Sequence, residues 1–224
     1  TSAGSPKKWT GWLHERGITV VHVVSSSRFA VKAEEAGVDA IVAEGFEAGG
    51  HNGREETTTL CLIPAVRTVT TLPLIAAGGI ATGEAMLAAR VLGAEGVQIG
   101  TRFALTAESS ANEVFKDYCL HLEEGDTRLL LKKLAPVRLV RNNFRSAVEA
   151  AEAVGASEEE LRILLGRGRA KRGIFEGDLE EGELEIGQVS VLLHGKGVQS
   201  VASVMQELVE ESRRAWERMQ ELDF

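Results

Sequence analysis

The chain has 224 residues, of which 44% are hydrophobic and 26% charged, and its formal net charge is -8. This composition is typical of a globular protein and excludes a disordered chain. The negative charge argues against nucleic-acid binding, because acidic residues closely follow the one basic cluster, at 167–172. No apolar run approaches the ~20 residues that a membrane-spanning helix needs, and no signal-peptide pattern is seen. We therefore expect a cytoplasmic protein that binds neither nucleic acid nor membrane.

The two cysteines, Cys61 and Cys119, lie in apolar stretches and lack the Cys/His spacing of a metal site. We expect both to be reduced residues of the core. The sequence therefore predicts no metal centre.

In the first hundred residues, short apolar runs alternate with helical patterns. Helices are predicted over 6–16, 28–36, 58–70 and 83–92, and strands over 18–24, 39–43, 74–77 and 96–99. Strands of 4 to 7 residues that alternate with helices are typical of a parallel α/β domain, in which the loops after the strands are free for function.

Beyond Gly100 this alternation ends. Residues 108–165 are mainly helical by pattern, with a capped helix start at Ser157, and residues 176–183 are expected to form a solvated loop. A last helix over 198–222 has one apolar face, made of Val201, Val204, Met205, Leu208 and Val209. We predict two regions, a β/α region over 1–107 that carries the active-site loops and a helical lobe over 108–224 that covers the site.

The loop at residues 44–53 contains four glycines, two acids and one histidine directly after a buried strand. Glycine lets the backbone approach a bound group closely, and histidine titrates near neutral pH. His51 is therefore the candidate catalytic residue, with an ordinary surface histidine as the alternative. Glu44 and Glu47 are candidate ligands, groups that adjust a neighbouring pKa, or solvated carboxylates. His22, within an apolar strand, is expected to be a core histidine.

Two further glycine turns follow consecutive strands, at residues 76–80 and 96–103. In (β/α)8 barrels the loops after the last two strands form a recurrent phosphate site, because backbone N–H groups converge there. The alternative is that these glycines only permit tight turns.

Three motifs, at residues 42–53, 75–80 and 93–103, resemble the nitronate monooxygenase (2-nitropropane dioxygenase) family. This family also contains the FMN-dependent enoyl-acyl-carrier-protein reductase II enzymes. The resemblance implies a TIM (β/α)8 barrel of which this chain holds the C-terminal half and an appended helical lobe. The expected partners are a small-molecule substrate, the missing N-terminal barrel half or a chain that supplies it, and a second copy in a homodimer.

The resemblance also implies FMN as the cofactor and His51 as the catalytic residue. The residues that it assigns to FMN are Gly49, Gly50, Ala77, Gly78, Gly79, Gln98, Gly100 and Thr101. The first expected activity is oxidation of alkyl nitronates or nitroalkanes with O2, with His51 as the base. The alternatives are an enoyl-thioester reductase that takes electrons from NAD(P)H, and a non-catalytic or flavin-free phosphate-binding fragment.

Overall fold

The computed structural model of the chain describes residues 1, 2 and 4–221, which form two compact units. The first unit contains residues 1–47, 55–99 and the described part of 207–224. The second contains residues 48–54 and 100–206. The last three residues of the predicted 108–224 region, including Leu222 at the end of the predicted last helix, lie outside the described residues.

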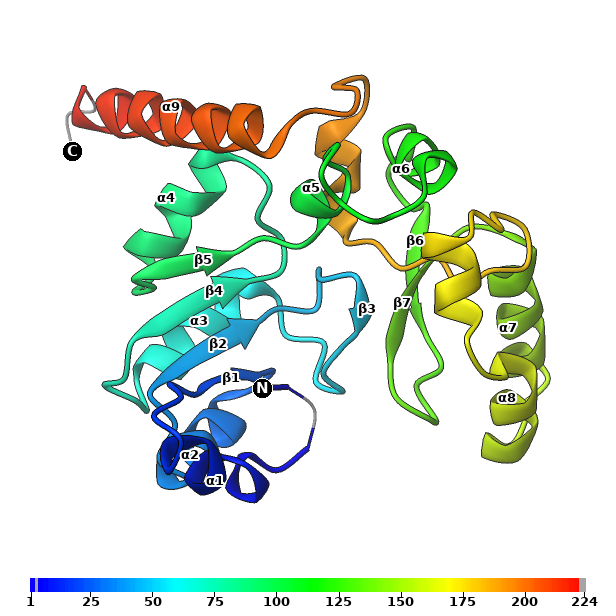
Figure 1. Ribbon diagram of the computed structural model, residues 1–224, viewed down its shortest axis with the longest axis horizontal. Coiled ribbons are helices and arrows are strands. Elements are labelled where there is room, and N and C mark those ends of the chain that lie inside the picture. Colours follow the sequence, from blue (N-terminus) through cyan, green and yellow to red (C-terminus); the bar gives the residue numbers. More distant parts are fainter. Residues whose placement is uncertain (3, 222–224) are drawn as a thin grey trace. The chain divides into compact units, whose positions relative to one another are not determined.

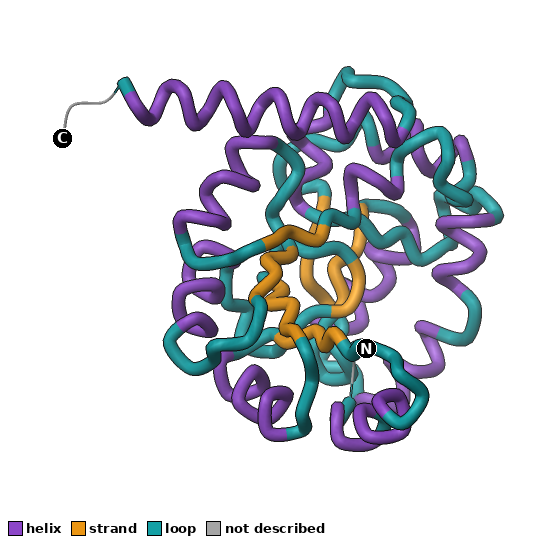
Figure 2. Tube along the Cα trace, turned by 60° about the vertical axis from the view of Figure 1, so that its left-hand side comes forward, coloured by secondary structure: helices purple, strands orange, loops and turns teal. Residues whose placement is uncertain are grey.

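A four-stranded parallel sheet forms the centre of the first unit (Figure 1). Its strands lie in the order β1 (Val21–Val24), β2 (Ala40–Glu44), β4 (Leu74–Ala77) and β5 (Gly96–Gln98). The intervening helices are α2 (Ser27–Glu35), α3 (Thr59–Arg67) and α4 (Gly83–Val91). Because each right-handed crossover leads to the next strand in the same direction, all three helices cover one face, as in (β/α) barrels. Figure 2 shows these helices outside the strands.

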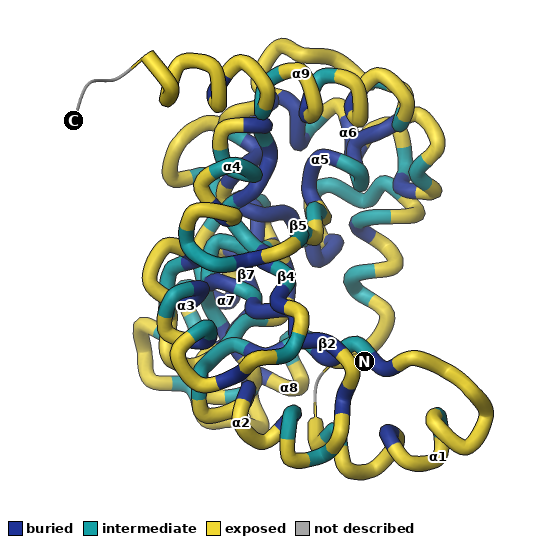
Figure 3. The backbone as a smooth tube through the Cα atoms, turned by 90° about the vertical axis from the view of Figure 1, so that its left-hand side faces the viewer, coloured by how far each residue is buried: buried dark blue, intermediate teal, exposed yellow. Residues whose placement is uncertain are grey.

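The core of the first unit lies between this sheet and its helices. Ile41 of β2 and Leu74 of β4 are fully buried against Leu62, Ile63 and Val66 of α3. Figure 3 shows β2 as a buried strand, while most of α1 (Thr10–His14) is exposed. The alternation of strands and helices predicted from the sequence is confirmed, with boundaries that differ by a few residues.

The second unit contains a three-stranded antiparallel sheet in the order β3-β7-β6. Its strands are β3 (Gly50–His51), β6 (Thr127–Leu130) and β7 (Val137–Val140). Its helices are α5 (Thr101–Ala104), α6 (Glu113–Cys119), α7 (Asn143–Ala153), α8 (Glu158–Leu165), η2 (Lys171–Phe175) and η3 (Gln188–Leu193). The expectation that 108–165 is mainly helical was wrong for β6 and β7. Apolar runs this short fit the residue spacing of a helix as well as that of a strand.

Two end elements complete the chain. The segment η1 (Pro6–Lys8) precedes α1, and α9 (Val201–Gln220) begins among residues of the second unit and continues into those of the first. The predicted apolar face of this last helix is only partly covered. Val204 and Leu208 are buried, whereas Met205 and Val209 are 50% and 59% exposed.

Several smaller expectations can be compared with the structure. Ser157 forms the predicted capping box with Glu160 at the start of α8. Cys119 is buried, as predicted, and burial raises the pKa of its thiol. Cys61 is exposed, so the prediction that it is a core residue was wrong. In the described part of the chain, no helix is long and apolar enough to cross a membrane. Among the same described residues, no three or more His, Cys, Asp or Glu side chains form a group that could hold a metal.

Candidate functional site

The carboxyl ends of three neighbouring strands in the first unit bring Glu44, Ala77 and Gln98 into register. Glu44 of β2 pairs with Ala77 of β4, which in turn pairs with Gln98 of β5. Gln98 is exposed, whereas Ala77 is buried. Burial raises the pKa of the Glu44 carboxyl group. The strand ends therefore combine a partly buried acid with an exposed amide.

The glycine turn after β4 is tightly packed on the loop after β2. Gly78 and Gly79 have φ angles of +80° and +68°, in the left-handed region that favours glycine. A Cβ atom on Gly78 would lie 2.6 Å from the carbonyl oxygen of Gly45. Both glycines are therefore required by the turn itself.

Glu47, in the loop after β2, and Thr59, the first residue of α3, hold this turn in place. The backbone N–H of Thr59 donates to both carboxylate oxygens of Glu47, each at 3.0 Å. The Thr59 hydroxyl lies 3.0 Å from Glu47 Oε2 and 2.9 Å from the carbonyl oxygen of Gly78. Glu47 thus has an internal structural partner.

The helix that follows this turn, α4, begins against α9. The backbone N–H of Gly83, at the start of α4, donates to Glu211 Oε2 at 2.9 Å. A Cβ atom on Gly83 would lie 2.1 Å from the backbone nitrogen of Ser212. This backbone N–H, at the start of a helix where an anion could bind, is therefore already bonded to the Glu211 carboxylate.

His51 lies on β3 in the second unit, and its imidazole is exposed. Gly50 and His51 pair with Arg138 and Val137 of β7. Arg138 is 2% exposed, and its Nε donates to the carbonyl oxygen of Ala48 at 3.1 Å. A strand and a buried guanidinium therefore fix the backbone that presents His51.

His22, on β1 of the first unit, is buried, as expected for a core histidine, and burial lowers its pKa.

The glycines before His51 lie against the segment at residues 185–187. A Cβ atom on Gly49 would lie 2.4 Å from the carbonyl carbon of Ile186, and one on Gly50 would lie 2.5 Å from Glu185 Oε2. The close approach of this segment is therefore enough to require glycine at both positions.

Two acids of the same unit, Glu183 and Glu185, lie two residues apart, the first buried and the second half-buried. Burial, together with the charge of Glu185, raises the pKa of Glu183 to about 7, while the charges of His51 and Arg169 lower it. Burial also raises the pKa of Glu185. The expectation that residues 176–183 form a solvated loop was wrong for Glu183, which is 7% exposed.

Gly100 and Thr101 lie at the start of α5. The Thr101 hydroxyl is buried and accepts a hydrogen bond from the backbone N–H of Gly187 at 3.0 Å. A Cβ atom on Gly100 would meet nothing within 4 Å. Gly100 is thus a position where space is open beside the backbone.

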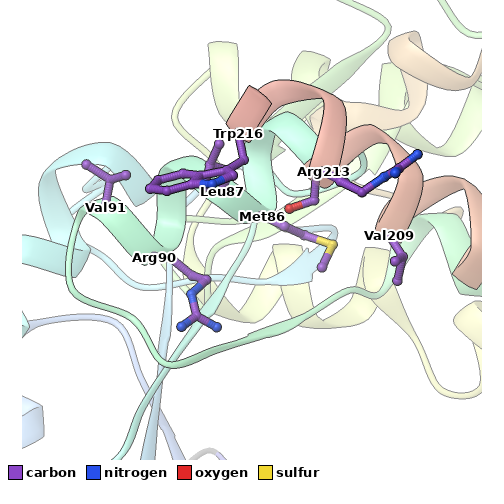
Figure 4. Close-up of a pocket in the computed structure, with 8 residues that line it drawn as sticks. Met86, Leu87, Arg90, Val91, Val209, Arg213 and Trp216 are labelled. Atoms are coloured by element: carbon purple, nitrogen blue, oxygen red, sulfur yellow. The ribbon is translucent and has the colours of Figure 1, made fainter. Parts of the chain in front are cut away.

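An open groove of about 590 Å³ lies on the first unit between α4 and α9 (Figure 4). It is lined by Met86, Leu87, Arg90, Val91, Val209, Ser212, Arg213 and Trp216. None of the predicted catalytic or FMN residues lines it. The residues that carry the predicted chemistry therefore do not form this groove.

The sequence model of the family described as nitronate monooxygenase matches residues 1–211. The chain belongs to this family. A probable nitronate monooxygenase of Staphylococcus haemolyticus is 42% identical over 119 residues, which are 49% of this chain and 33% of that protein. One from Staphylococcus aureus is 42% identical over 123 residues, 51% of this chain and 35% of that protein. The chain thus matches about a third of the length of these curated relatives.

Two solved structures are similar to this chain over nearly its whole length. FabK from Thermotoga maritima is 37% identical with a TM-score of 0.88, and the match covers 98% of this chain and 68% of that one. Nitroalkane oxidase from Streptomyces ansochromogenes is 26% identical with a TM-score of 0.77, and the match covers 97% of this chain and 63% of that one. The α/β fold with its parallel sheet is thus the fold of these family structures.

Proposed function

We propose that the chain is part of an FMN-dependent oxidoreductase that oxidises alkyl nitronates and nitroalkanes with O2, with His51 as the base. The observation that carries this proposal is the presentation of an exposed His51 from β3, whose backbone is fixed by Arg138. The match of residues 1–211 to the nitronate monooxygenase family supports it.

The first unit fits FMN at its strand ends. The turn at Gly78 and Gly79 places no side chain at the end of β4, and the exposed Gln98 ends the neighbouring strand. One feature restricts the fit, because Glu211 already occupies the first amide of α4. We therefore assign FMN contacts in this unit to Ala77, Gly78, Gly79 and Gln98, without the start of α4.

In the second unit we assign FMN contacts to Gly49, Gly50, Gly100 and Thr101. The open space beside Gly100 supports its assignment. The two glycines before His51 are already required by the chain's own packing, so their assignment rests on the family resemblance.

FMN, when bound, supplies the electron-transfer chemistry. An imidazole nitrogen of His51 takes the proton from the carbon that bears the nitro group of a neutral nitroalkane. Where the substrate is already a nitronate anion, the protonated ring offsets its negative charge. The residues of this chain thus bind and orient the substrate, and His51 takes its proton.

A second candidate is an enoyl-thioester reductase that uses NAD(P)H and FMN. The greater likeness to FabK than to nitroalkane oxidase favours it, and His51 would then donate a proton to the reduced double bond.

The test is a pair of assays on the protein supplemented with FMN. O2 uptake with an alkyl nitronate and no NAD(P)H is the expected result. Oxidation of NAD(P)H that depends on a crotonyl thioester, without nitronate oxidation, would instead establish the reductase. A flavin-loaded protein that is inactive in both assays would overturn both candidates.

A further inference from the structure

The groove between α4 and α9, which we call the α4–α9 groove, has two helices of the first unit as its walls. The backbone N–H of Gly83, at the start of α4, donates to Glu211 Oε2 of α9 at 2.9 Å. Further along α9, a guanidinium nitrogen of Arg218 donates to Glu84 Oε1 at 3.2 Å. These contacts fix the two helices on each other, so the groove is formed by the chain itself.

Five apolar side chains line the α4–α9 groove. They are Met86, Leu87 and Val91 of α4 and Val209 and Trp216 of α9. Val91, Val209 and Trp216 are 71%, 59% and 52% exposed. In Figure 4 the indole of Trp216 extends from α9 across α4, between Val91 and Met86. Single exposed apolar residues are common, but apolar residues gathered in one groove mark an interaction site.

The part of α9 in the first unit has two apolar stripes. Leu208 and Ala215 are buried, whereas Val209 and Trp216 are exposed. The members of each pair are seven residues apart, about two helical turns, so each pair lies along one side of the helix. The buried stripe packs inside this chain, whereas the exposed stripe lines the groove.

The shape of the α4–α9 groove favours a helix over a small molecule. Sites for small molecules enclose most of the ligand surface, whereas this groove of about 590 Å³ is open to solvent. An amphipathic helix can place its apolar side in an open groove and leave its polar side in water. The occupant that fits this shape is therefore a helix.

The charged residues that line the α4–α9 groove are Arg90 and Arg213, and no acid is among its described lining residues. The Arg90 guanidinium is exposed and has no hydrogen bond or ion pair with another described residue. Arg213 Nη1 lies 3.8 Å from Glu217 Oε1, and this ion pair is weak because both side chains are largely exposed. Figure 4 shows the two guanidinium groups on opposite sides of the apolar side chains. In a protein of net charge -8, the groove thus carries local positive charge that favours an acidic partner.

We propose that the α4–α9 groove binds an acidic amphipathic helix of another protein. The apolar side of that helix contacts Val209 and Trp216, and its carboxylates pair with Arg90 and Arg213. A second copy of this chain fits less well, because a two-fold interface places the same patch of each copy against itself and brings like charges together. The proposal is independent of the oxidoreductase activity, since none of the predicted catalytic or FMN residues lines the groove.

The first test uses two fluorescein-labelled helical peptides. Both have leucines along one side, and the flanking residues are glutamates in one peptide and lysines in the other. Fluorescence anisotropy should show that the protein binds the glutamate peptide roughly tenfold or more tightly than the lysine peptide. Added salt should weaken this binding, because it screens the exposed charges. Equal binding of the two peptides, or no binding of either, would overturn the proposal.

Variants of the protein show where the glutamate peptide binds. The double variant Arg90→Gln, Arg213→Gln and the single variant Trp216→Ala should each weaken binding by roughly tenfold or more. The matched control is Arg214→Gln, an exposed arginine of α9 outside the groove, which should leave the affinity unchanged. Circular dichroism of each variant checks that it is folded. Unchanged affinity in the folded double variant and in Trp216→Ala would overturn the proposal.

Two other occupants of the groove would give different results. A dimer in light scattering that Trp216→Ala dissociates would assign the groove to a second copy of the chain. Sedimentation with phosphatidylglycerol vesicles that Trp216→Ala abolishes would assign it to a lipid surface. Either result would overturn the proposal of a helical protein partner.

Discussion

The strand ends of the first unit and the surroundings of His51 in the second are built in different ways. In the first unit, Glu44, Ala77 and Gln98 end neighbouring strands whose order follows the sequence. In the second, three segments far apart in the sequence, at 48–54, 137–140 and 183–187, meet around β3. Local patterns are sufficient to predict the first arrangement, but the second depends on packing between distant segments.

The largest expected effect comes from removing the imidazole in the second region. His51→Ala should lower turnover by roughly 10²- to 10⁴-fold, the range for a general acid or base. The matched control is His121→Ala, an exposed histidine of the same unit, which should keep the activity. Steady-state rates with nitronate and with crotonyl thioester provide the measurement. Equal rates for His51→Ala and the natural protein would remove His51 from the mechanism.

The next effect concerns the close packing of β3. Gly49→Ala should destabilise the protein by about 3 kcal/mol, because its Cβ would meet the backbone of Ile186 at 2.4 Å. Gly100→Ala is the control, since φ there is -91° and nothing lies within 4 Å. Its cost should stay below roughly 0.5 kcal/mol. Urea denaturation gives both free energies of unfolding, and equal values would contradict the packing described for β3.

Glu183 should make the stability depend on pH. Its pKa is raised to about 7 in the folded protein from an ordinary 4.5, so folding favours the protonated form. The stability that this group contributes is present below about pH 4.5 and is lost as the pH rises through about 7. Glu183→Gln should remove this dependence and raise the free energy of unfolding at pH 8 by on the order of 2 kcal/mol. Denaturation curves at pH 5 and pH 8 provide the measurement. If the free energy of unfolding changes between these pH values by the same amount in the natural protein and in Glu183→Gln, Glu183 titrates normally.

The smallest effect is expected in the first unit. Thr59→Val removes the hydroxyl that lies between Glu47 and Gly78 and should cost about 1 kcal/mol. Thr58→Val is the control, because Thr58 precedes α3 without a side-chain capping bond. Thermal unfolding of the two variants measures the difference. A loss as large for Thr58→Val would show that the hydroxyl of Thr59 has no special role.

Much of the fold could be predicted from the sequence, because β2 and β4 are short apolar runs bounded by glycine and capped helices. The family could also be predicted, from glycine motifs with specific spacing. The strand character of Gly50 and His51 could not, since β3 has two residues and depends on β7. The burial of Glu183 was missed because it depends on how the segment at 183–187 packs against distant residues of the second unit. The alternation Glu-Leu-Glu-Ile was the available signal, but the neighbouring acids made a solvated loop the simpler prediction.

The central claim, that this chain contributes to an FMN enzyme, is tested most directly by its visible spectrum. The protein is mixed with FMN, free flavin is removed by gel filtration, and the absorbance of the protein fraction is recorded. The account predicts that flavin absorbance stays with the protein. A colourless protein fraction, with all of the FMN in the later small-molecule fractions, would contradict it.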